Sequence, residues 1–159
     1  MIDTIYAATM AAYNRWQNDN LFGCADGLSD EDRKRDRGAF FKSIHHTLNH
    51  ILWADLTWMS RFTTSAPPPT PHSQSQFLHE EWRALRRART TLDAAIEAWA
   101  ASLDPAWLAT PAPGRWAPRP YAFLVAHMFN HQTHHRGQVH ALLTAVGASP
   151  ADTDLLKLP

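Results

Sequence analysis

Two proline-rich stretches divide this chain and limit what it can fold into. They read PPPTP at 67–71 and DPAWLATPAPGRWAPRP at 104–120. Because proline lacks a backbone donor and disrupts helix interiors, these stretches mark breaks between elements. The segments around them carry apolar residues at three- and four-residue steps, which is the period of an amphipathic helix. The pattern predicts long helices at about 2–20, 39–63, 74–101 and 120–147.

The four segments indicate an all-α fold, a four-helix bundle in one domain, 1–159. No segment shows sustained alternation of polar and apolar residues, so no sheet is predicted. Ser29 and the three acidic residues after it favour a short helical turn between the first two long helices. The connection between the third and fourth helices is long for an up-down bundle, which suggests an unusual crossover there. The inward stripe expected of the first helix is Ile2, Ile5, Tyr6, Thr9, Tyr13 and Trp16.

Charge and composition exclude several classes of function. Lys+Arg and Asp+Glu are both 15, so no net charge attracts nucleic acid or an anionic membrane. No apolar run approaches the roughly 20 residues of a membrane span, and the N-terminus does not resemble a signal peptide. One cysteine, Cys24, excludes an internal disulfide, and a cytoplasmic location is expected. The basic run of the third helix is expected to be a solvated face balanced by Glu80 and Glu81: Arg83, Arg86, Arg87 and Arg89.

The last helix places two histidines, His131 and His135, in the middle of its apolar stripe. Side chains four residues apart lie on one helix face, so both imidazoles can bind one metal ion. Two neutral imidazoles in a dry core would otherwise each need a hydrogen-bond partner. The alternative is a pair of hydrogen-bonded core histidines, and His127, one turn earlier, competes with His135 as the partner of His131.

A metal site needs at least one more ligand, and the second helix offers His45, His46 and His50. His45 lies near the apolar stripe of that helix, whereas His50 lies on another sector. His46 and His50 are also four residues apart. Spacing alone does not choose among the three.

Three blocks of the sequence resemble the DinB family over nearly the whole chain: YNRWQNDN, FFKSIHHTLNHILWADLTWMSRF and HMFNHQTHHRGQ. The resemblance implies a four-helix bundle, often a homodimer, that holds one divalent metal ion on three histidines. One histidine of the family comes from a pattern like H-I-L-x-A-D and two from H-x3-H. In this sequence these positions are His50, His131 and His135.

Three protein ligands leave a coordination position open, as in catalytic zinc sites, and imidazoles suit zinc or nickel. The resemblance implies a metal-dependent transferase that uses a small-molecule thiol, and a metal-bound water would also allow a hydrolase. The alternative is a non-catalytic stress-response or ligand-binding bundle, with a structural metal closed by a fourth ligand such as His46 or His127. A metal-free helical scaffold is a third reading.

Ligating imidazoles usually donate their second N–H to an oxygen, and Asp55, Asn130 and Gln138 are the candidates for that role. Asp55 could instead pair with an arginine such as Arg136. Cys24 is expected to lie in a polar loop and to take no part in the chemistry.

Overall fold

A computed structural model describes residues 2–159 and confirms the all-α fold. Its four long helices are α1 (Thr4–Asp26), α3 (Ile44–Phe62), α4 (Trp82–Ala101) and α6 (Tyr121–Ala145). Two short α-helices, α2 (Asp30–Lys34) and α5 (Pro105–Ala109), lie in the connections. Three 3-10 helices complete the described part of the chain: η1 (His72–Phe77), η2 (Gly114–Trp116) and η3 (Leu155–Lys157).

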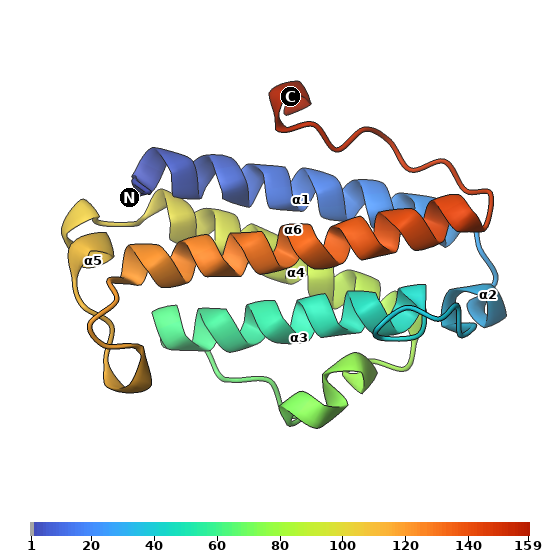
Figure 1. Cartoon of the computed structure of the whole chain (residues 1–159), viewed down its shortest axis with the longest axis horizontal. Helices are drawn as coiled ribbons and strands as arrows, with labels where there is room; N and C mark the ends of the chain where they lie inside the picture. Colours follow the sequence, from blue (N-terminus) through green and yellow to red (C-terminus); the bar gives the residue numbers. More distant parts are fainter. Residues whose placement is uncertain (1) are drawn as a thin grey trace.

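The four long helices lie side by side, and α1 and α6 run opposite to α3 and α4 (Figure 1). Each of α1 and α3 packs against both α4 and α6. Because α3 and α4 run the same way, the connection 63–81 must return along the length of the bundle. This segment, which carries η1 against α3, is the unusual crossover. The sequence prediction had placed it between the third and fourth long helices.

Polar side chains begin four of the α-helices, α1, α2, α3 and α5, by capping free backbone N–H groups. Asp3 accepts a hydrogen bond from the Tyr6 amide at 2.8 Å at the start of α1. The Ser43 hydroxyl accepts one from the His46 amide at 3.1 Å at the start of α3. Ser29 caps α2 in the same way, where a short turn was predicted. Such caps stabilise a helix by about 1 kcal/mol each.

Three helix boundaries differ from the prediction, and one of them is the start of α3, which lies at Ile44 and not near 39. Helix α1 continues to Asp26, so the expectation that Cys24 lies in a polar loop is wrong; it is half-buried within the helix. Helix α4 begins at Trp82, because the segment before it folds as η1 against α3. The Asn49 side chain holds this segment by bonding the backbone N and O of His79, at 2.7 and 3.1 Å.

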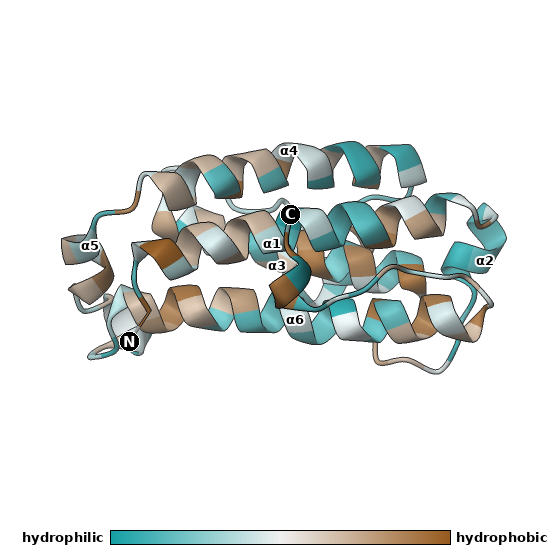
Figure 2. Cartoon of the chain, turned by 90° about the horizontal axis from the view of Figure 1, so that it is seen from above, coloured by the Kyte–Doolittle hydropathy of each residue, from teal (hydrophilic) through white to brown (hydrophobic). Residues whose placement is uncertain are grey.

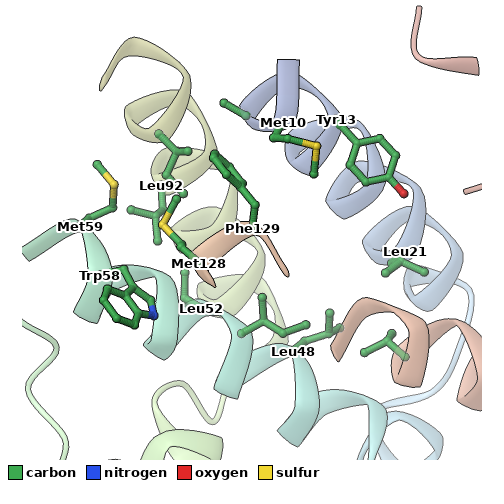
Figure 3. Close-up of a cluster of buried hydrophobic side chains, with 14 of the residues drawn as sticks. Met10, Tyr13, Leu21, Leu48, Leu52, Trp58, Met59, Leu92, Met128 and Phe129 are labelled. Atoms are coloured by element: carbon green, nitrogen blue, oxygen red, sulfur yellow. The ribbon is translucent and has the colours of Figure 1, made fainter. Parts of the chain in front are cut away.

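The apolar core lies between the four long helices (Figure 3), and Leu48, Leu52, Met128 and Phe129 are at most 1% exposed. Each long helix carries both hydrophilic and hydrophobic residues (Figure 2). No helix within residues 2–159 is long and apolar enough to cross a membrane.

The inward stripe predicted for the first helix is wrong in part. Ile5 is 74% exposed, and Tyr6 and Thr9 are exposed too, whereas the rest of the stripe packs against the core: Ile2, Tyr13 and Trp16. The face of α1 that packs inward carries buried amides among its apolar residues, including Asn14 and Asn18. Since these amides have hydrogen-bond partners inside the bundle, apolar periodicity reveals only part of the buried face of this helix.

Candidate metal centre

Three histidines meet where α3 packs against α6. His50 extends from α3, and His131 and His135 come from consecutive turns of α6. The Nε2 atom of His131 lies 3.3 Å from Nε2 of His50 and 3.1 Å from Nε2 of His135. Each residue places a ring nitrogen within 4.8 Å of the other two. The fold thus brings together the three residues that the family resemblance selected, including His50, which spacing had not distinguished.

These separations suit a single metal ion. An ion with tetrahedral bonds of about 2.0–2.1 Å to imidazole keeps its ligand nitrogens about 3.3 Å apart. The two separations from Nε2 of His131, 3.1 Å to His135 and 3.3 Å to His50, are close to that value. His50 and His135 are buried and His131 is half-buried, so the rings are held in place by their surroundings.

The three imidazoles are neutral at neutral pH. Burial, and then the neighbouring histidines of the cluster, lower the pKa of His50 to about 3 and that of His131 to about 4. Burial also lowers the pKa of His135. Neutral imidazole, which carries a free lone pair on one ring nitrogen, is the form that binds metals.

Hydrogen bonds to the outer nitrogens orient two of the rings. Nδ1 of His135 lies 2.7 Å from Oε1 of Gln138. An amide oxygen accepts only, so Nδ1 carries the proton and the Nε2 lone pair of His135 faces the cluster. Nδ1 of His50 lies 2.9 Å from the hydroxyl of the buried Ser75.

The donor set fits a divalent cation better than it fits hydrogen bonds among the rings. A proton on Nε2 of His131 can satisfy either His50 or His135, not both. Nδ1 of His131 lies buried with no hydrogen-bond partner in residues 2–159 in either arrangement, so the three converging Nε2 lone pairs carry the comparison. A cation accepts all three lone pairs at once.

Of the three residues predicted to accept hydrogen bonds from the ligand imidazoles, only one contacts a histidine of the cluster. Gln138 contacts His135 as described, whereas Asn130 is exposed. Asp55 does not contact the histidines, because its carboxylate is paired with Arg89 at 2.6 Å. Sequence reasoning missed Ser75. It lies in a segment predicted to begin a helix, and only the packing of η1 on α3 brings it to the site.

A buried ionic network lies in the same bundle core. Arg89 pairs with Asp55 at 2.6 Å and with Asp93 at 2.8 Å, and Arg136 donates to the side-chain oxygen of Asn14. Asp55 therefore pairs with an arginine, as the alternative interpretation held, although the partner is Arg89 and not Arg136. The assignment of Arg89 to a solvated face is wrong, since this residue is 2% exposed. The two buried arginines balance the two buried aspartates, which limits the cost of burying charge.

The remaining histidine candidates lie outside the cluster. Nε2 of His45 is 2.9 Å from the backbone oxygen of His79, which occupies that ring nitrogen. The ring centroid of His127 lies 6.2 Å from that of His131. Neither His127 nor His46 belongs to the group of converging ring nitrogens found in residues 2–159.

A cavity of about 400 Å³ adjoins the cluster, and His50 and His131 form part of its wall. Three indole side chains line the same cavity: Trp53, Trp58 and Trp116. The histidine cluster is therefore next to a space large enough for a small molecule.

Fold and site together define a class of protein, the helical bundles whose facing helices bring histidines together in the core. The model of the DinB family matches residues 1–159, and the chain belongs to that family. It is also 24% identical, over 157 residues, to Protein DinB of Bacillus subtilis (strain 168). That alignment covers 94% of this chain and 91% of that protein. No solved structure matches the chain.

Proposed function

We propose that this protein is a metal-dependent enzyme that binds one divalent ion, zinc or nickel, on His50, His131 and His135. The observation that carries the proposal is the convergence of three neutral imidazoles beside a cavity of about 400 Å³. Membership of the DinB family supports the same reading.

The chemistry follows from the number of ligands. Three protein ligands leave at least one position for water or substrate. A metal bound there would lower the pKa of a coordinated thiol or water and so supply a nucleophile. This supports S-transfer from a small-molecule thiol, or hydrolysis, as the reaction class. Gln138 and Ser75 would keep the ligand rings oriented through their outer nitrogens.

A structural metal in a non-catalytic bundle is the second candidate, and it requires a fourth protein ligand. The distance of His127 from His131, 6.2 Å between ring centroids, disfavours that reading. The open cavity beside the histidines also favours a site that admits a small molecule.

Elemental analysis of untagged, undialysed protein tests the proposal. We expect about one equivalent of zinc or nickel per chain in the wild type. His50→Ala, His131→Ala and His135→Ala should each lose it. His140 provides a matched control, because His140→Ala removes an imidazole from the same helix outside the cluster. Far-UV circular dichroism would verify that each variant is folded.

Two outcomes would reject the metal centre: a wild type that binds no zinc or nickel even after either ion is added, or full occupancy in the three cluster variants. A positive result would justify assays of thiol transfer and hydrolysis with the metal-loaded protein. We also expect a homodimer, as the family resemblance implies, and sedimentation equilibrium would measure it.

A further inference from the structure

The cavity beside the histidines has two arginines in its wall, Arg61 at the end of α3 and Arg115 in η2. Both guanidinium groups lie over indole rings. The Arg61 guanidinium is 4.5 Å from the ring centroid of Trp58, and that of Arg115 is 4.5 Å from the ring centroid of Trp116. The two rings are 5.7 Å apart, so they hold the two cations close to each other.

Neither arginine has an acidic partner. No Asp or Glu of residues 2–159 forms an ion pair with Arg61 or Arg115, and none lines the cavity. Partial burial and the charge of Arg115 lower the pKa of Arg61. Two unpaired guanidinium groups in one wall leave the cavity with a positive charge that a bound anion would neutralise.

Along α3, Arg61 lies near the C-terminal end, well beyond His50. Trp58, over which the Arg61 guanidinium rests, follows His50 by eight residues. Eight residues of α-helix rise by about 12 Å. Between these ends the wall consists largely of aromatic rings, since Trp53 also lines the cavity. Such a wall suits a flat, apolar body.

We propose that this cavity binds a small organic acid, with its carboxylate between Arg61 and Arg115, its apolar body on the tryptophans and its reacting group at the histidine cluster. The inference rests on the proposed function for the role of the cluster, and it adds the class of substrate. The expected ligand carries its anionic head roughly 10–12 Å from the reacting atom, about two turns of helix. Guanidinium groups suit such a head because they bind carboxylates with paired, charge-assisted hydrogen bonds.

Calorimetric titration tests the proposal with two probes of matched shape, 4-phenylbutyrate and its neutral amide. The protein is the full chain, in zinc-loaded and zinc-stripped forms, and zinc per chain is measured for every preparation. The variants are Arg61→Gln, Arg115→Gln and both together. Arg87→Gln is the charge-matched control, because Arg87 is exposed on α4 and does not line this cavity.

We expect the zinc-loaded wild type to bind the acid at least about 10-fold more tightly than the amide, because charge-assisted hydrogen bonds are the strong ones. Each single substitution should weaken acid binding about 10-fold and leave amide binding and zinc content unchanged. Arg87→Gln should bind both probes like the wild type.

Three results would overturn the proposal: no binding of the acid, equal binding of acid and amide, or acid binding that ignores both arginine substitutions. The last result, combined with loss of acid binding on zinc removal, would place the carboxylate on the metal instead. The metal centre would survive these failures if zinc still binds. Conversely, arginine-dependent acid binding in a chain that takes up no zinc would retain the anion site and reject the metal-dependent enzyme.

Discussion

Replacing Arg89 by methionine should destabilise the bundle by about 3–5 kcal/mol, the usual cost of breaking a buried ion pair. Arg89 contacts two carboxylates, at 2.6 Å in Asp55 and 2.8 Å in Asp93, and all three side chains are at most 3% exposed. Methionine fills much of the space but leaves both carboxylates without their cation. Since small domains are stable by only about 5–15 kcal/mol, this one change removes a large share of the total.

Most of the cost should come from Asp55. Asp93 keeps hydrogen bonds from Asn18 at 2.9 Å and from Asn14 at 3.1 Å. Asp55 has Arg89 as its ion-pair partner, and the uncharged side chain of Gln132 is its other stabilising neighbour. Burial raises the pKa of Asp55, and Arg89 opposes this. Without the arginine, the pKa of Asp55 should rise further above its unfolded value.

Urea unfolding of metal-stripped protein at pH 7 and pH 5 measures the effect. A carboxyl whose pKa is raised in the fold takes up a proton on folding, so its burial costs less at low pH. The free energy of unfolding that Arg89→Met loses should therefore be smaller at pH 5 than at pH 7. Adding Asp55→Asn to the same chain should recover part of this loss. Arg87→Met, on the exposed side of the same helix, should change stability by at most about 0.5 kcal/mol. A deficit below about 1 kcal/mol at pH 7, or one that does not depend on pH, would refute this account.

Three further predictions follow from the site and the core. Metal-free protein should lose thermal stability as the pH falls from 6.5 towards 4. The reason is that the unfolded chain binds protons at His50 and His131, whereas the fold keeps their pKa values near 3 and 4. Calorimetry should show a smaller loss of stability in a variant that carries glutamine at both positions. Gln138→Ala should weaken zinc binding about 10- to 100-fold in a chelator competition without unfolding the chain. Phe129→Ala, at a fully buried site, should cost about 3–5 kcal/mol in urea unfolding, and a loss below 1 kcal/mol would contradict the core assignment.

The sequence predicted the features of this protein that the periodicity of a helix determines. Proline clusters and apolar periodicity located all four long helices, although α4 begins later than expected. The four-residue spacing of His131 and His135 sufficed to put both imidazoles on one face, because helix geometry fixes that relation. The third histidine depends on how α3 sits against α6. Its selection therefore came from resemblance to a family and not from spacing.

Polar groups inside the bundle account for most of what the sequence did not predict. In the sequence, Arg89 belongs to a basic run with Arg83 and Arg87, and these two residues are indeed exposed. The first half of α4 is also largely hydrophilic (Figure 2), so nothing in the local sequence sets Arg89 apart. Its burial depends on Asp55, 34 residues earlier in the chain. Part of the buried face of α1 was missed for the same reason, since Asn14 and Asn18 look like surface residues until Asp93 is placed beside them.

The way in which the fold is stabilised bears on what the metal does. A structural metal supplies folding free energy that a small apolar core does not provide, so removal of the metal unfolds the chain. Here the apolar core and the ion pairs of Arg89 are formed by residues other than the three histidines. We therefore expect chelation to remove the metal, to leave far-UV circular dichroism unchanged and to lower the melting temperature. The loss should match the binding linkage, about 2.7 kcal/mol when free zinc is 100 times its Kd. Loss of helical signal at 25 °C on chelation would instead support a structural metal, and would count against a site held open for chemistry.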